Sequence, residues 1–144
     1  MRWLIKDVAK VHPVTRRCLA KATPNDKTDY MRIGAINCVK HPGKFIAIAL
    51  YSGKNLLGWG MLDLYLSHDS PLIRTYLYVK KQYRRHGYGT MILKRCREAA
   101  RRRGRGIRVC PHTKSNRKFF HAVKVAQTEV VPGFETFYRK GRWW

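Results

Sequence analysis

The sequence predicts one domain of mixed α+β class, built on a mostly antiparallel sheet. The chain has 144 residues, 44% of them hydrophobic, which is enough to bury one core but not two independent ones. Two apolar runs flank the turn Ser52–Asn55, a pattern typical of a β-hairpin. An amphipathic segment from Tyr88 predicts a helix after a further strand. We therefore expect residues 1–144 to form a single domain.

The N-terminal third predicts one strand and one or two helices. A short strand fits Trp3–Lys6, and a helix fits Val8–Ala22. The polar stretch Thr23–Asp29 predicts a loop, and a second short helix fits Tyr30–Val39. His41-Pro42-Gly43 ends this helical region, because proline and glycine both interrupt a helix.

The pattern changes to strand at Phe45. The segment FIAIALYSGKNLLGWGMLDLYL, Phe45–Leu66, contains the two strands of the hairpin. After the loop SHDSP, the run Ile73–Val79 nearly alternates β-branched and aromatic residues with others and predicts a third strand. We expect these three strands to pair in series, each antiparallel to the one before.

The C-terminal half predicts two helices separated by a strand. From Tyr88 to Arg103, small or apolar residues recur every three or four positions, and lysine and arginine fill most of the other face. Gly104 and Gly106 end this helix. A strand in GIRVCPHT follows, and then a helix over Ser115–Val125 with Ser115 as its N-cap. One or two final strands are expected in Phe134–Trp144.

The formal net charge is +23, from 31 Lys and Arg against 8 Asp and Glu. About half of these basic residues lie between Lys80 and Lys118. Such an excess attracts nucleic acid and other acidic macromolecules, so we expect an acidic macromolecule, protein or RNA, as partner. The alternative is a solubilising surface charge without any one partner.

Hydropathy and cysteine spacing predict the cellular location of the protein and the state of its thiols. No apolar run reaches the roughly 18 residues that cross a bilayer, so we expect a cytoplasmic protein without a membrane partner. Four cysteines lie far apart with no C-x-x-C pair, which fits reduced, buried thiols. We therefore expect no metal site and no disulfide framework.

The stretch RRHGYGTMILKR, Arg84–Arg95, places two glycines at the start of the long helix. A helix N-terminus carries free N–H groups and partial positive charge, and glycine lets an anion approach this backbone. The stretch therefore predicts a phosphate site. It is not a Walker P-loop, since no Gly-Lys-Ser or Gly-Lys-Thr occurs, and Ile92 stands where a dinucleotide-binding fingerprint needs its third glycine.

The segment YLYVKKQYRRHGYGTMILKRCREAARRRG, Tyr76–Gly104, resembles the GNAT superfamily of acyl-CoA-dependent N-acetyltransferases. It matches the family's fourth strand, its Arg/Gln-x-x-Gly-x-Gly/Ala loop and its third helix, and the order of elements along the chain also agrees. The resemblance implies a GNAT-like fold with helices on both faces and a sheet that splays between its fourth and fifth strands. It implies acetyl-CoA as co-substrate and makes a homodimer an open possibility.

Carried over by position, the resemblance implies a set of coenzyme-binding residues. Backbone amides of the glycine loop hold the pyrophosphate, and the end of the preceding strand pairs with the pantetheine arm. Asn116 matches an asparagine that the family often uses near the pantetheine, and Phe120 falls near the family's tyrosine position. The residues are Leu77, Tyr78, Val79, Arg84, Arg85, His86, Gly87, Tyr88, Gly89, Thr90, Asn116 and Phe120.

The catalytic residues depart from the family pattern. Many members have a glutamate early in the fourth strand as base, whereas Leu72–Val79 contains no acid. The preferred candidates for the general base are Asp69 and His68 in the SHDS loop. Asp63 is another candidate, and proton removal by ordered water is the alternative. The family's tyrosine acid is also missing, so His121 is the candidate that protonates the leaving thiolate. An alternative alignment places Phe120 at that position and leaves no acid.

The reaction that this resemblance implies is attack of a primary amine on acetyl-CoA. The positive surface argues against a free polyamine and favours a protein lysine, a protein N-terminus or an aminoacyl-tRNA. The alternative is a catalytically weakened GNAT-like module that binds nucleic acid or a partner protein through its basic surface.

Overall fold

A computed structural model describes residues 1–7, 38, 40–109, 114–123 and 126–127. The predicted helix Val8–Ala22, the loop Thr23–Asp29 and the final strands in Phe134–Trp144 lie outside these residues, as does nearly all of the predicted helix Tyr30–Val39.

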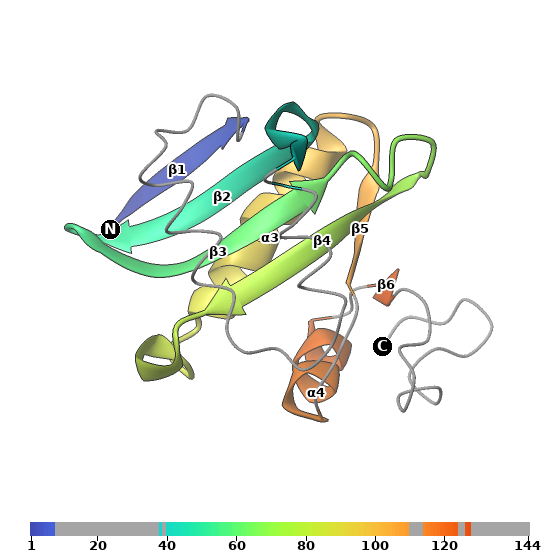
Figure 1. The fold of residues 1–144 in the computed structure, drawn as a ribbon. Helices are drawn as coiled ribbons and strands as arrows, with labels where there is room; N and C mark the ends of the chain where they lie inside the picture. Colours follow the sequence, from blue (N-terminus) through green and yellow to red (C-terminus); the bar gives the residue numbers. More distant parts are fainter. Residues whose placement is uncertain (8–37, 39, 110–113, 124–125, 128–144) are drawn as a thin grey trace.

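The described residues form a six-stranded mixed sheet whose strands follow one another in chain order (Figure 1). The first four strands pair antiparallel, while β4 with β5 and β5 with β6 are parallel. The strands are β1 Arg2–Asp7, β2 Phe45–Ser52, β3 Asn55–Asp63, β4 Leu72–Val79, β5 Gly106–Val109 and β6 Ala126–Gln127. The predicted mixed, mostly antiparallel sheet is confirmed.

The described helices are α3 Tyr88–Arg101 and α4 Lys114–Ala122, with short 3₁₀ turns at η2 Pro42–Lys44 and η3 Lys81–Tyr83. The predicted start of the long helix at Tyr88 is confirmed. The predicted N-cap at Ser115 is wrong, because α4 already includes Lys114, and a serine marks a helix start only to within a residue or two. The helix also ends at Ala122, before the predicted Val125, because the β-branched Val123 favours a helix less, and the short strand β6 follows.

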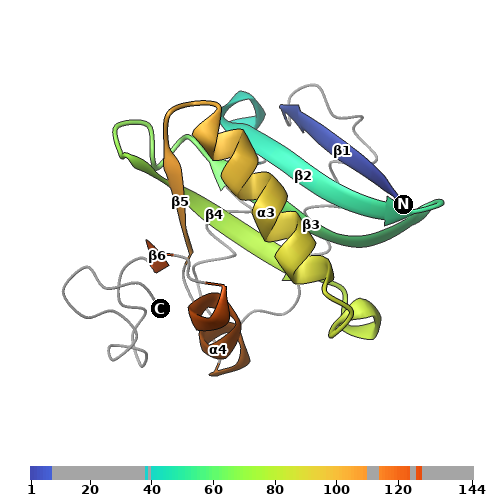
Figure 2. The same cartoon turned by 180° about the vertical axis from the view of Figure 1, so that it is seen from behind.

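Helix α3 lies across one face of the sheet (Figure 2). On β2, Ile46, Ile48 and Leu50 join the core beneath α3, and the intervening Phe45, Ala47 and Ala49 join a second core on the other face. Phe120 brings α4 into the core on the α3 side. The helices predicted for the other face fall among the residues that are not described, apart from Cys38, which packs in the second core.

Two glycines of β3 allow α3 to approach the sheet closely. A Cβ at Gly60 would overlap Sγ of Cys96 and lie 3.1 Å from Cγ2 of Ile92. A Cβ at Gly58 would lie 2.7 Å from the carbonyl oxygen of Tyr78. Contacts this short are repulsive, so any larger residue at these positions pushes the helix or a strand away.

The sheet opens between β4 and β5. Only Leu72, Ile73 and Arg74 pair with β5, opposite Gly106, Ile107 and Arg108, whereas β4 continues to Val79. The predicted splay between the fourth and fifth strands is thus present. The second half of β4 has β3 on one side and, among the described residues, no strand on the other.

Candidate functional site

The N-terminus of α3 lies where β4 ends and forms a cluster of free backbone donors. Gly87 is the N-cap residue with φ 81°, and Arg85 also has a positive φ of 64°. The first helical bond runs from the Met91 N–H to the Gly87 carbonyl at 3.1 Å. The amides of residues 88–90 make no hydrogen bond to any described residue. Free amides at a helix N-terminus, beside left-handed turns, favour an anion.

Gly87 and Gly89 satisfy different requirements. Gly87 has the left-handed conformation that glycine adopts without strain, and a Cβ there would meet nothing within 4 Å. At Gly89 a Cβ would lie 3.3 Å from Cζ of Phe119 and 3.7 Å from Cγ2 of Val79. Gly89 therefore marks the point at which α3, β4 and α4 meet, and its lack of a side chain keeps the backbone accessible.

Basic side chains fix the loop that leads into α3. Arg84 donates its Nε–H to the carbonyl of Val79 at 2.9 Å, and its guanidinium lies 5.7 Å from the centre of the Tyr78 ring. The His86 ring packs parallel to Tyr88, with Nδ1 2.7 Å from the carbonyl of Arg84. Arg85 is exposed. The loop is thus held in shape by its own residues while its positive charge remains at the surface.

The open edge of β4 presents alternate backbone groups. The Lys80 N–H donates to the carbonyl of Leu57 on β3. Backbone groups alternate in direction along a strand, so those of Thr75, Leu77 and Val79 point away from β3. On that side β5 pairs with β4 only as far as Arg74. Tyr78 directs its backbone to β3 and packs its ring against Trp59 on the face away from α3.

Helix α4 lies beside the N-terminus of α3, near Gly89. Phe119 packs near Gly89, and Phe120, only 5% exposed, lies in the core. Arg97 of α3 donates to the carbonyl of Val123 at 2.6 Å, which ties the end of α4 to α3. His121 is exposed. Asn116 lies near the start of α4, but its side chain is outside the described part.

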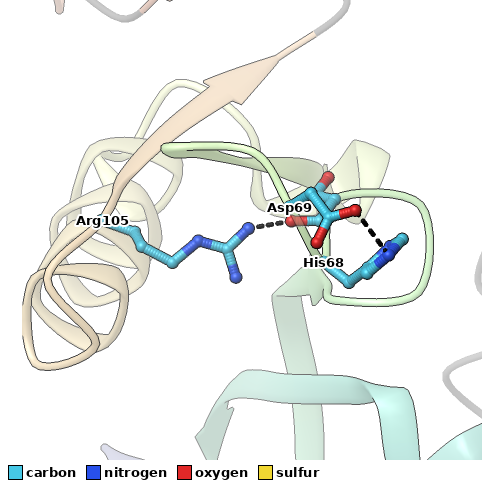
Figure 3. Close-up of polar contacts among 4 residues, drawn as sticks. His68, Asp69 and Arg105 are labelled. Atoms are coloured by element: carbon cyan, nitrogen blue, oxygen red, sulfur yellow. Dashed lines mark hydrogen bonds and ion pairs between the residues drawn. The ribbon is translucent and has the colours of Figure 1, made fainter.

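His68 and Asp69 pair with each other in the loop between β3 and β4 (Figure 3). His68 Nε2 lies 2.8 Å from Asp69 Oδ2, and the two side chains are 73% and 86% exposed. Arg105 holds this loop by donating to the carbonyls of Ser67 and Ser70. The pair lies at the Leu72 end of β4, about 23 Å of strand away from Val79, so the structure does not bring it beside the glycine loop.

Asp63 and Tyr76 form a buried pair that the sequence pattern did not reveal. Asp63 is fully buried, and its carboxylate accepts the N–H groups of Tyr65 and Leu66 and the hydroxyl of Tyr76 at 2.8 Å. Burial, and then the Asp63 charge, raise the pKa of Tyr76 well above its usual value. The only sequence signal was an aspartate at the end of an apolar strand. With these donors in place, Asp63 fixes a turn and has no access to solvent.

The described residues contain no group of three or more His, Cys, Asp and Glu side chains arranged to hold a metal ion. No helix in this part of the chain is long and apolar enough to cross a membrane.

Comparison with known proteins gave one family and several similar folds. The family described as "Acetyltransferase (GNAT) domain" matches residues 42–140. No curated protein matches the sequence.

Among solved structures, the PaiA N-acetyltransferase of Thermoplasma acidophilum, in complex with coenzyme A, has a TM-score of 0.60 at 11% identity, over 99% of this chain and 96% of that one. A Pyrococcus furiosus structure described as a putative acetyl transferase has a TM-score of 0.62 at 14% identity, over 90% and 97%. An aminoglycoside 6'-N-acetyltransferase complexed with coenzyme A has a TM-score of 0.52 at 17% identity, over 70% of this chain. The chain spans only 57% of the length of that last protein.

Proposed function

The chain belongs to the GNAT family of acetyltransferases, and on this premise we propose that it transfers an acetyl group from acetyl-CoA to a primary amine of a macromolecule. The acceptor is a protein lysine, a protein N-terminus or an aminoacyl-tRNA. The observation that carries the proposal is the cluster of free amides at the start of α3, reached through Gly87 and Gly89. Its donors and partial positive charge fit a pyrophosphate.

Acetyl-CoA supplies an activated acetyl group as a thioester. The amides of residues 85–90 would hold its pyrophosphate, with Arg84 and Arg85 adding positive charge. The outward backbone groups of Leu77 and the outward N–H of Val79 would bind the pantetheine arm as a neighbouring strand does, while the Val79 carbonyl accepts from Arg84. A backbone N–H on this open edge would also donate to the thioester carbonyl as the amine attacks.

The reaction needs two proton transfers. The acceptor nitrogen bonds to the carbonyl carbon and loses a proton, the C–S bond breaks, and the CoA sulfur gains a proton. We propose that His121, which is exposed on α4, protonates the sulfur. His68 and Asp69 stay our candidates for the base, since a coenzyme that follows β4 from the glycine loop extends toward their end of the strand. Ordered water is the alternative.

A second function has its own support. The exposed side of α3 and the turn that follows it present five exposed basic side chains, namely Lys94, Arg95, Arg101, Arg102 and Arg103. This face suits the phosphates of a nucleic acid, as a binding module without catalysis would require. The free amides at the start of α3 favour the enzyme, because such a module has no need of them.

Titration with acetyl-CoA tests the enzyme. Wild-type protein should bind in the micromolar range, and Gly89→Glu should abolish binding because a carboxylate would stand among the amides. Gly43→Glu is the matched control, since Gly43 lies in η2 with open space around it. An absence of wild-type binding would overturn the proposal. Labelled acetyl-CoA in a cell lysate, followed by nuclease or protease digestion, then identifies the class of acceptor.

A further inference from the structure

Three charged residues lie in register across β3, β4 and β5. Asp63 pairs with Arg74, and Arg74 pairs with Arg108. Ile73, Ile107 and Val109 belong to the core beneath α3. Because neighbouring residues of a strand face opposite sides, Arg74 and Arg108 face away from α3. This face therefore carries two adjacent guanidinium groups and one carboxylate.

The carboxylate of this row is already engaged. Asp63 accepts two backbone amides and the Tyr76 hydroxyl. The Arg74 guanidinium lies close enough to that hydroxyl to act on its pKa, in the lowering direction. Arg74 is thus linked to Asp63 through Tyr76, and the row keeps a net positive charge beside Arg108.

Arg108 has no partner among the described residues. Its side chain is half-buried, and its Nε–H is buried without an acceptor. None of the described carboxylates pairs with it. Asp63 holds the donors given above, Asp69 binds His68, and Glu98 lies 3.4 Å from Arg95. Asp7 lies on β1, at the far edge of the sheet. A buried donor without an acceptor costs free energy, and a second cation alongside increases this cost. An anion that binds there would relieve both penalties.

The position of the pair relates it to the acetyl transfer. Arg74 and Arg108 are the last residues that join β4 to β5 before the two strands separate. The gap beyond them is where the proposed function places the coenzyme's reactive end. An anionic group held by Arg108 would therefore belong to the molecule that approaches from the face opposite α3.

We propose that Arg108, with Arg74 beside it, binds a carboxylate or phosphate of the amine acceptor and so selects acidic acceptors. The inference rests on the proposed function for the identity of the ligand, though not for the presence of an anion site. A guanidinium suits both anions because its fork of N–H donors can bond two oxygens at once.

Arginine-edited NMR of protein labelled at Nε tests the site directly. The resonance that Arg108→Gln removes identifies the Arg108 Nε–H. Sodium acetate and methyl phosphate, titrated separately with coenzyme A present, represent the two anions. We expect this resonance to shift and saturate with at least one of them while Arg102, exposed beyond α3, shifts little. No shift, or equal shifts at both arginines, would overturn the proposal.

Labelling with acetyl-CoA in a lysate tests the role in selection. Arg108→Gln should lower acceptor labelling about tenfold, the equivalent of one charge-assisted hydrogen bond, and leave acetyl-CoA affinity unchanged. Arg102→Gln removes the same charge from the opposite face and should keep full labelling. Unchanged labelling by Arg108→Gln contradicts the inference. Failure of wild-type protein to bind acetyl-CoA contradicts the proposed function instead, and the NMR result still decides the anion site.

If Arg108→Gln does not fold, Arg108→Lys replaces it. Lysine keeps the charge but lacks the planar fork, so Arg108→Lys should retain only part of the acceptor labelling. Full labelling by Arg108→Lys would show that the fork has no role and would count against the proposed site.

Discussion

Gly87 and Gly89 lie two positions apart, yet alanine should affect them differently. At Gly87, with φ 81°, a Cβ forces a left-handed residue and costs about 1 kcal/mol of stability. At Gly89 the one tight contact of a Cβ is with Cζ of the Phe119 ring at 3.3 Å, which a small ring movement relieves.

We predict that Gly87→Ala lowers the free energy of unfolding by about 1 kcal/mol, whereas Gly89→Ala changes it by less and mainly weakens acetyl-CoA binding. Urea unfolding and calorimetric titration of both variants measure the two effects. Equal losses of stability would show that the loop conformation does not depend on Gly87.

The Asp63–Tyr76 pair should govern stability in alkali. Because the pKa of Tyr76 is raised in the folded protein, the phenol stays protonated there while the unfolded chain ionises near pH 10. Stability is therefore fully present below pH 10 and is lost as pH rises further. Burial raises the pKa of Cys96 to about 12, which adds a loss that begins near pH 9.

We predict that Tyr76→Phe lowers the free energy of unfolding at pH 8 by roughly 1.5–3 kcal/mol, because Asp63 loses a donor in a buried place. The same variant should show a shallower decline between pH 10 and 11. Urea unfolding across this range measures both, and Cys96→Ala separates the thiol from the phenol. A decline as steep as that of wild type would contradict the assignment.

At the scale of elements, α3 packs closely on β3 where Cys96 lies against Gly60. Gly60 leaves room for Sγ of Cys96, which belongs to the core beneath α3. Close packing leaves no other space for an added methyl group. The effect of a substitution at Gly60 on stability should therefore depend on the residue at position 96.

We predict that Gly60→Ala destabilises the protein by about 1–3 kcal/mol and that Cys96→Ala, which removes the opposing sulfur, recovers part of this loss. Thermal or urea unfolding of the two single variants and the double variant measures the coupling. Gly43→Ala is the control, since nothing lies near Gly43. Additive losses would mean that the helix moves away instead of packing against the new methyl.

The elements that the sequence predicted well are those defined by local pattern. The hairpin turn at Ser52–Asn55 and the periodicity from Tyr88 each depend on neighbouring residues, and both are present. The two-residue strand β6 has no pattern of its own and exists through pairing with β5. The Asp63–Tyr76 and Arg74–Arg108 contacts depend on register between strands, which a single sequence does not specify.

At the scale of the whole molecule, the +23 charge should dominate encounters with polyanions. We predict that single-stranded RNA binds with an affinity that falls on the order of a hundredfold between 50 and 200 mM salt. Replacing Arg101, Arg102 and Arg103 by glutamine should reduce the logarithmic salt slope by about two. Fluorescence anisotropy with a labelled oligonucleotide measures both. Salt-independent binding would show that charge is not the cause.

The short pairing between β4 and β5 has a consequence for the protein without its coenzyme. The second half of β4 is then an edge strand with unpaired backbone groups, and such strands pair with strands of other molecules. Mutual repulsion between highly charged copies opposes this self-association, and salt weakens the repulsion. Coenzyme A bound along this strand would cover the unpaired groups and prevent aggregation. Preparations should therefore precipitate at high salt when the coenzyme is removed and stay clear when it is added.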